Sequence, residues 1–346
     1  MTRPLRIAVV APVAWRTPPR AYGPWELVAH NLTEGLVAAG HDVTLFATAD
    51  SLTSARLESA VPRGYEDDPS QDAKVCEYLH LAHAMERAGE FDLVHNHFDF
   101  MGLAYSRLIA APMVTTIHGF SSERIVPVYR RYDGHVAYVS ISDADRHPDL
   151  TYAATVYNGI DAGDFRFGDS PGEHLLYFGR MHPDKGPHEA IEIARRAGRR
   201  LVMAGLIQDA GYWERTCLPH VDGERVVYLG NVGPAERRRV LAGAAALLHP
   251  IHFDEPFGLS VAESMISGTP VIAYDRGAMP ELIERGVGGF RVRGVEEAVA
   301  ACGKIGDVDR AECRRSALRR FSREAMTEGY ERVYEGVLAR RRAVSR

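Results

Sequence analysis

The chain has 346 residues, which exceeds one average domain and falls short of three, so two domains of similar size are expected. Its 46% hydrophobic and 25% charged residues exclude a disordered or fibrous protein. Its net charge of −5 excludes a chain-wide positive field, so we expect no nucleic-acid partner.

The first half of the sequence alternates short apolar runs with segments of helical length. Residues 5–11 are predicted to form a buried strand, and residues 25–39 a helix that Gly40 ends. Later strands are predicted at 42–47, 91–94, 113–117, 136–141 and 155–157. This alternation predicts a doubly wound parallel sheet of the Rossmann type in an N-terminal domain spanning residues 1–165.

A second alternation begins after residues 162–173, whose Gly, Asp and Pro content without an apolar period suits a linker. Strands are predicted at 174–178, 200–204, 225–229, 245–249, 270–273 and 289–292. They predict a second Rossmann-like domain over residues 166–325, and so an α/β protein with two parallel-sheet domains. Ser322 is a suitable N-cap, and apolar residues at helical spacing predict a closing helix over residues 326–346 that needs a surface to cover.

Cysteine usage and hydropathy indicate the compartment. The four cysteines form no CxxC pair and are too few to stabilise a chain of this size through disulfide bonds. No stretch approaches the roughly 20 apolar residues that a membrane helix needs. The first residues lead into a strand rather than a signal peptide. We therefore expect a cytoplasmic protein without an integral membrane segment.

The most informative stretch is residues 252–263, which places Glu255 and Glu263 eight positions apart around a predicted strand-to-helix turn. Each carboxylate could grip two neighbouring hydroxyls, as sugars offer, because it accepts two hydrogen bonds side by side. At the carboxyl edge of a parallel sheet, such a turn also directs backbone N–H groups into the crevice. The expected donors are the amides of Phe257, Gly258 and Leu259.

The residues alone leave simpler interpretations of this stretch open. Ser260 and Glu263 also fit the spacing of a capping box, in which the glutamate folds back on the helix start. Glu255 alone could equally be a solvated loop acid.

Two further predicted strands end in residues suited to chemistry. Gly179 and Arg180 follow one strand, with Lys185 five positions later, and preplaced cations lower a barrier at which negative charge builds on phosphate oxygens. In a chain with 41 basic residues, however, they could equally be surface cations. His118 follows another strand, where a lone histidine is more often structural than catalytic.

These stretches resemble glycosyltransferase family 4. The two glutamates match its E-x7-E signature, which continues into Ser-Gly-Thr-Pro-Val-Ile-Ala at 267–273, and the resemblance extends from residues 22–23 and 40–43 to the closing helix. It implies the GT-B fold, with two domains facing a cleft and the closing helix crossing back to the first domain. It also implies retention of configuration at the anomeric carbon.

The resemblance assigns roles to the candidate residues. Glu263 is similar to the family glutamate that holds the ribose diol, and Glu255 to the one that contacts the donor sugar. Arg180 and Lys185, with Gly179, correspond to residues that bind the pyrophosphate. His118 falls at the position of a histidine near the reacting carbon, and we expect it to position and stabilise rather than attack.

One loop departs from the family pattern. Family members commonly have two consecutive glycines in the first loop, where a backbone N–H meets the distal phosphate, but this chain has Gly23 followed by Pro24. Proline has no N–H to donate. Either the amide of Trp25 replaces it, with Gly23 still against the donor, or the donor and acceptor lie differently here.

No metal or other cofactor is expected. Asp143-Ala144-Asp145 and Asp307-Val308-Asp309 spell the DxD motif of metal-dependent transferases but are interpreted as acids at helix starts. His95-Asn96-His97 lacks a completing ligand, and His95 is a candidate acceptor contact.

The leading hypothesis is a retaining, metal-independent glycosyltransferase that uses a UDP-sugar and a small-molecule or saccharide acceptor. The arginine-rich sequence resembles actinobacterial members, including some that build oligosaccharide antibiotics. The alternatives are a nucleotide-sugar epimerase or hydrolase on the same fold and a non-catalytic nucleotide-sugar binding module. A nicotinamide-dependent oxidoreductase is disfavoured because no glycine fingerprint follows residues 5–11.

Overall fold

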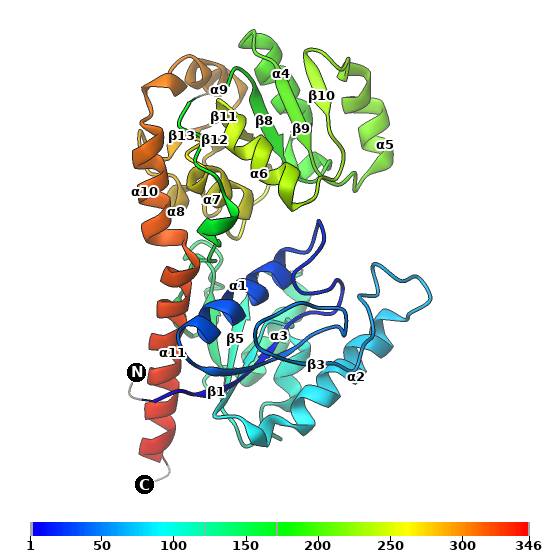
Figure 1. The fold of residues 1–346 in the computed structure, drawn as a ribbon, viewed down its shortest axis with the longest axis vertical. Coiled ribbons are helices and arrows are strands. Elements are labelled where there is room, and N and C mark those ends of the chain that lie inside the picture. The colour runs from blue at the N-terminus through cyan, green and yellow to red at the C-terminus, as the bar shows by residue number, and fades with distance from the viewer. Residues whose placement is uncertain (1–2, 121, 171, 345–346) are drawn as a thin grey trace. The chain divides into compact units, whose positions relative to one another are not determined.

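The computed structural model describes residues 3–120, 122–170 and 172–344, which form two compact units. Unit 1 comprises residues 1–159 and 323–346, and unit 2 comprises residues 160–322 (Figure 1). Each unit is built on one parallel sheet. The predicted fold class, α/β with two Rossmann-like parallel-sheet domains, is therefore confirmed.

Unit 1 contains a seven-stranded sheet in the order β3-β2-β1-β4-β5-β6-β7. β1 lies inside this sheet, where Ile7 pairs with Val43 on one side and Leu93 on the other. The strand order reverses between β1 and β4, which is where ligands bind in doubly wound sheets. The strands are β1 (Arg6–Val10), β2 (Asp42–Phe46), β3 (Arg56–Glu58), β4 (Leu93–Asn96), β5 (Met113–Ile117), β6 (Ala137–Ser140) and β7 (Tyr152–Thr155).

The helices of unit 1 include the last helix of the chain. Gly35 of α1 allows α11 to approach closely, because an added Cβ there would lie 2.1 Å from Thr327 Oγ1. The expected return of the closing helix to the first domain is thus confirmed. The helices are α1 (Pro24–Ala38), α2 (Ala73–Glu86), α3 (Val126–Tyr132) and α11 (Arg323–Val344), with the short 3-10 helices η1 (Ala88–Glu90), η2 (Met101–Tyr105) and η3 (Glu123–Ile125).

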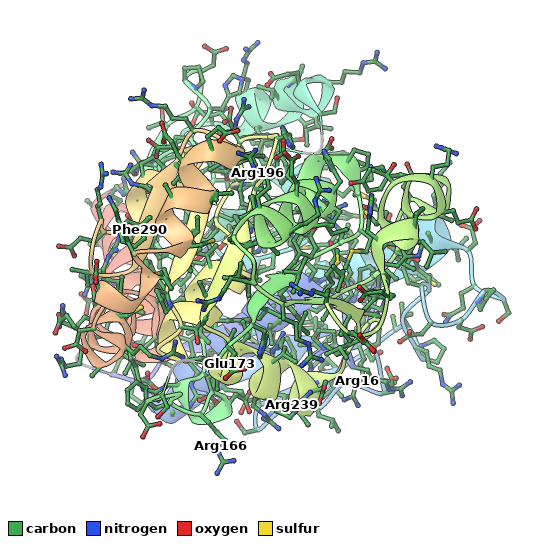
Figure 2. The ribbon with its side chains drawn as sticks, turned by 90° about the horizontal axis from the view of Figure 1, so that it is seen from above. Arg16, Arg166, Glu173, Arg196, Arg239 and Phe290 are labelled. Carbon is green, nitrogen blue, oxygen red and sulfur yellow. The ribbon has the colours of Figure 1, made fainter. Side chains whose placement is uncertain are left out.

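Unit 2 contains a six-stranded sheet in the order β10-β9-β8-β11-β12-β13. The strands are β8 (Leu175–Phe178), β9 (Leu201–Ala204), β10 (Val226–Tyr228), β11 (Ala246–His249), β12 (Val271–Tyr274) and β13 (Gly289–Val292). Seen from above in Figure 2, Arg196 marks the end of α4, Phe290 marks β13, and Glu173 lies just before β8.

The helices of unit 2 cover its sheet. They are α4 (Pro187–Arg196), α5 (Ala210–Tyr212), α6 (Pro234–Gly243), α7 (Leu259–Ile266), α8 (Met279–Leu282), α9 (Val295–Cys302) and α10 (Arg310–Phe321). Short turns of helix are η4 (Ala162–Asp164), η5 (Pro183–Lys185), η6 (Trp213–Cys217), η7 (Leu218–His220) and η8 (Ile305–Asp307). Within the described ranges, no helix is both long and apolar enough to cross a membrane.

Three features of unit 1 and the connection differ from the sequence-based expectation. The three-residue strand β3 reads Arg-Leu-Glu and offers no apolar run to detect. The strand expected at 155–157 is β7, which ends at Thr155. The stretch expected to be a linker belongs to unit 2, because Phe165 is 4% exposed and the amide of Gly168 donates to the carbonyl of Ser267.

Candidate active site

The loop after β8 presents the two predicted cations. Gly179 continues from β8, its amide donating to the Ala204 carbonyl at 3.0 Å, and the Tyr177 hydroxyl donates to the Arg180 carbonyl at 2.7 Å. The short helix η5 ends at Lys185, and Gly186 then turns the chain into α4 with a φ of 65°. A Cβ at Gly186 would lie 2.0 Å from the carbonyl oxygen of Pro250, so only glycine fits this approach.

Lys185 and Glu255 form an ion pair. The Lys185 Nζ donates to Oε2 of Glu255, and both side chains are 14% exposed. The same ammonium lies 4.6 Å from the ring centroid of Phe253, within the range of a cation–π contact. The backbone of Glu255 is held independently, since its carbonyl accepts the amide of Ala278 at 2.9 Å. Glu255 is therefore a largely buried, paired carboxylate and not the solvated loop acid of the simpler interpretation.

Several neighbouring basic side chains act on the Glu255 carboxylate. Burial by itself would raise its pKa, but Lys185, His249 and Arg180 together outweigh burial and hold the pKa below its ordinary value. His249 Nε2 lies 3.7 Å from Glu255 Oε2, and burial lowers the pKa of His249 to about 4. Arg180 donates to the side chain of Gln208. The structure thus gathers Arg180, Lys185 and Glu255 after β8 and β11 and keeps the carboxylate ionised.

Glu263 lies one turn inside α7 and has its own partner. Its side chain is 2% exposed, and its Oε1 lies 3.4 Å from a guanidinium nitrogen of Arg237 on α6. Burial raises the pKa of Glu263, and Arg237 opposes that effect. The N-cap of α7 is Gly258, with a φ of 99° and no side chain, so the capping box weighed for Ser260 is wrong. Glu263 is free of that local role.

The amides at the start of α7 lie beside Glu255 in sequence. Those of Gly258 and Leu259 donate to no acceptor among the described residues, as expected for the first turn of a helix. Phe257 is buried and packs edge-on against Phe321, with ring centroids 5.8 Å apart. This anchor fixes where the helix begins, at the carboxyl end of β11.

In unit 1, His118 follows β5 and is 8% exposed. Its ring stacks on Trp25, with centroids 5.5 Å apart and an interplanar angle of 20°. Its Nε2 lies 3.0 Å from Nδ1 of His97, which follows β4 and is fully buried. Burial lowers the pKa of His118 to about 3, so the ring is neutral. The contact with His97 was not predicted, because the two residues follow different strands.

His95 does not act as an acceptor contact. It is fully buried, and its Nδ1 and Nε2 are hydrogen-bonded to the hydroxyls of Tyr334 and Thr116 at 2.7 and 2.8 Å. Tyr334 belongs to α11, so the histidine ties the closing helix to the sheet of unit 1. A histidine with both nitrogens satisfied inside a core is a structural residue.

The first loop of unit 1 ends at a helix start. Gly23 is the N-cap of α1 and Pro24 its first residue, where a missing N–H costs nothing. The amide of Trp25, which follows, has no acceptor among the residues that the structure describes. Glu26 is 2% exposed and accepts the Trp15 amide at 3.3 Å, and burial raises its pKa to about 7.

The aspartate strings have local partners. Asp309 caps α10, as interpreted, by accepting the amides of Ala311 and Glu312. No helix begins at Asp143 or Asp145, so that interpretation is wrong: Asp143 pairs with Arg146 at 3.4 Å in a region of turns.

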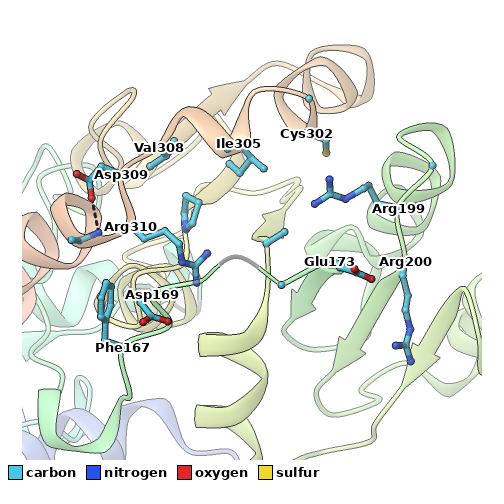
Figure 3. A pocket seen from close by; sticks show the side chains of 17 residues that line it. Phe167, Asp169, Glu173, Arg199, Arg200, Cys302, Ile305, Val308, Asp309 and Arg310 are labelled. Atoms are coloured by element: carbon cyan, nitrogen blue, oxygen red, sulfur yellow. Dashed lines mark hydrogen bonds between the residues drawn. The ribbon is translucent and has the colours of Figure 1, made fainter.

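A cavity of about 1040 Å³ lies at the other edge of the unit 2 sheet (Figure 3). Its lining includes Glu173, two residues before β8, and Arg200, one residue before β9, so the cavity opens at the amino ends of the strands. Arg310 also lines it but already donates to three backbone carbonyls and the Thr269 hydroxyl. Ligands of parallel sheets bind at the carboxyl ends, so this cavity does not compete with the Lys185 and Glu255 region.

Two family models match the sequence: Glycosyltransferase Family 4 over residues 26–163 and Glycosyl transferases group 1 over residues 172–305. A D-inositol 3-phosphate glycosyltransferase of Nocardia farcinica is 30% identical over 75% of this chain and 68% of its own length. The crystal structure of AviGT4, a glycosyltransferase involved in avilamycin A biosynthesis, has a TM-score of 0.73 and 25% identity, and covers 97% of this chain and 98% of its own. HepE of Anabaena, solved with UDP and glucose, has a TM-score of 0.71 and 19% identity over 96% of this chain and 99% of its own.

Proposed function

Because this chain belongs to glycosyltransferase family 4 and has the GT-B fold, we propose that it transfers a sugar from a UDP-sugar to a hydroxyl of a small-molecule or saccharide acceptor, with retention of configuration and without a metal. The observation that carries the proposal is the cluster of Arg180, Lys185 and Glu255 beside the free amides that begin α7. It joins fixed cations to an ionised carboxylate at the carboxyl ends of two parallel strands.

The cations supply what a departing nucleoside diphosphate needs. Negative charge grows on the phosphate oxygens as the sugar leaves, and preplaced Lys185 and Arg180 stabilise that charge without reorganisation. The first-turn amides of α7 add hydrogen-bond donors and the positive end of the helix dipole. This set of groups makes a metal ion unnecessary for the leaving group.

The two glutamates divide the recognition of donor hydroxyls. Glu263, whose Oε1 faces Arg237, accepts hydrogen bonds from the ribose diol. Glu255 accepts hydrogen bonds from hydroxyls of the sugar. UDP is the favoured nucleotide because the structurally similar HepE was solved with UDP and glucose. We propose that His118, a neutral group, positions the donor sugar.

The acceptor is proposed only by class. Of the similar proteins named above, one is a D-inositol 3-phosphate glycosyltransferase and another is involved in avilamycin A biosynthesis. We favour a natural-product or oligosaccharide acceptor. All four cysteines are free and buried, which suits a reducing compartment, and we propose that the enzyme acts in the cytoplasm.

The test is a donor screen followed by transfer. Each nucleoside diphosphate sugar is scored by the rise in melting temperature it causes, because a ligand that binds only the native state stabilises it. The best donor is then incubated with hydroxyl acceptors, and nucleoside diphosphate release is measured with and without a chelator. We expect acceptor-dependent release that survives the chelator and an α-linked product from an α-linked donor.

Other outcomes separate the competing functions. Release without any acceptor would indicate a hydrolase, conversion of the donor sugar an epimerase, and tight binding without turnover a binding module. Inversion at the anomeric carbon, or loss of turnover in the chelator, would contradict the mechanism proposed here.

A further inference from the structure

A second cluster of side chains lies beside the Lys185 and Glu255 loops of unit 2. His188 and Glu189 lie in the first turn of α4, and His252 lies between β11 and α7. One nitrogen or carboxylate oxygen from each of the three residues lies within 4.8 Å of the other two. The separation between His252 Nε2 and Glu189 Oε2 is 3.0 Å. Two imidazoles and a carboxylate therefore converge on one point.

We propose that His188, Glu189 and His252 bind a divalent transition-metal ion of the Zn²⁺ type, with water in the fourth position. Ligands about 2.0–2.1 Å from a tetrahedral ion are roughly 3.3 Å apart, so only small rotations of these side chains are required. Imidazole nitrogen favours Zn²⁺ and its neighbours over Mg²⁺ and Ca²⁺, which prefer oxygen ligands. The set of two histidines and one glutamate is itself a common zinc ligand set.

The surroundings of His188 resemble the outer shell of a metal site. Its Nδ1 lies 2.7 Å from the hydroxyl of Tyr212, which also accepts the backbone amide of His188 at 3.4 Å. When Nδ1–H donates to that hydroxyl, the lone pair is left on Nε2, and ligating histidines are commonly fixed in this way. Tyr212 is 8% exposed and is held in the core.

The other two ligands, His252 and Glu189, are partly exposed to solvent, and contacts with neighbouring residues hold His252 in place. The His252 amide donates to the Asp184 carbonyl at 2.7 Å, and Tyr274 lies edge-on to the His252 ring with centroids 5.9 Å apart. The side chains of His252 and Glu189 are 40% and 20% exposed, which gives an ion a path of entry. No short motif marks this site, because Glu189 and His252 are 63 positions apart in the sequence.

The ion would join two segments that carry predicted donor contacts. His188 follows Lys185 by three positions, and His252 precedes Glu255 by three positions. A metal bridge between these segments stabilises the native unit without taking part in the reaction. The ion pair of Lys185 with Glu255 and the hydrogen bond from Ala278 to Glu255 do not include any of the three ligands. Turnover is thus expected to persist when the ion is removed.

Metal binding can be measured without any knowledge of the donor or acceptor, so this proposal is tested independently of the proposed function. The purified chain is stripped with a chelator, dialysed, and titrated with Zn²⁺ by calorimetry, with Mg²⁺ as the comparison ion. We expect saturation at one Zn²⁺ per chain and no saturable binding of Mg²⁺. At 100 times its dissociation constant, Zn²⁺ is expected to raise the melting temperature by about 5 °C or more.

Two variants test the histidine ligands, and a third serves as the control. His252→Ala and His188→Ala are each expected to weaken Zn²⁺ binding at least about tenfold and to remove the thermal shift. The control is His220→Ala, which deletes an exposed histidine outside the cluster and should bind like the wild type. His252 is exposed, so its variant should fold, and circular dichroism checks that it does. Absence of saturable binding, or equal binding by wild type and His252→Ala, would overturn the proposal.

Discussion

Lys185→Met tests whether the ammonium of Lys185 serves the nucleotide or merely neutralises Glu255. Methionine keeps most of the aliphatic stem and removes the charge, so the packing on Phe253 is largely retained. Transfer is expected to fall at least about tenfold, which corresponds to about 1.4 kcal/mol of lost transition-state stabilisation. Lys304→Met is the matched control, because Lys304 is an exposed lysine of the same unit that forms no ion pair among the described residues.

The same substitution has a calculable effect on stability. Breaking a buried ion pair by removing one partner costs about 3–5 kcal/mol, and an exposed pair is worth about 0–1 kcal/mol. Both side chains of this pair are 14% exposed, so we expect about 2 kcal/mol. For a unit of this size that loss lowers the melting temperature by about 6 °C. The pKa of Glu255 should rise in the variant, because its strongest positive neighbour is gone.

The double variant Lys185→Met, Glu255→Gln separates the two roles. It removes the unpaired carboxylate, so most of the lost stability should return. The affinity for UDP, which lacks the sugar that Glu255 is proposed to contact, is measured by calorimetry in all variants. We expect weak UDP binding in both variants that lack Lys185 and near-normal binding in Glu255→Gln. Recovery of UDP binding in the double variant would refute a direct role for Lys185.

Three further predictions concern unit 1. His97→Phe removes the hydrogen bond to His118 and should lower kcat about tenfold with little change in donor affinity, whereas His97→Asn should recover most of the rate. Equal kcat in all three proteins would show that His97 only fills space. Because burial lowers the pKa of His118 to about 3, its ring stays neutral from about pH 5 to pH 8. An inflection in kcat/KM near pH 6.5 that disappears in His118→Gln is therefore not expected. Burial raises the pKa of Glu26 to about 7 in the folded protein, so folding favours the protonated form of this side chain. The stability that this preference contributes is fully present below about pH 4.5 and is lost as pH rises through 7. Between those pH values, urea unfolding should therefore show the free energy of unfolding of the wild type falling by up to about 3 kcal/mol relative to that of Glu26→Gln. A difference between the two proteins that does not change with pH would contradict this prediction.

The sheet cores were predictable from sequence, because buried parallel strands read as continuous apolar runs. The strands at 113–117 and 289–292 were predicted with the bounds of β5 and β13. The edge strand β3 was not predicted, because it has no apolar run: Arg56 and Glu58 flank a single leucine. Edge strands gain their structure from the neighbouring strand, a contact that local patterning does not encode.

The candidate site was predictable to the extent that its residues follow the carboxyl ends of predicted strands. Lys185 and Glu255 belong to separate sequence motifs, and the pairing of β8 with β11 brings the ends of these two strands together. Contacts between distant segments could not be read in this way. The His97–His118 and Glu189–His252 pairs depend on which strand neighbours which, and neither has a local pattern.

Arg237 is the most consequential of these unpredicted contacts. Glu263 can accept two ribose hydroxyls only when it is ionised, because a protonated carboxyl has become a donor at one oxygen. Its burial at 2% exposure favours the protonated form, and Arg237 is the cation that opposes this effect. A guanidinium nitrogen of Arg237 lies 3.4 Å from Oε1 of Glu263. If Glu263 holds the ribose as proposed, recognition of the ribose depends on Arg237 of α6, a residue that carries no motif and that favours the charged form of Glu263.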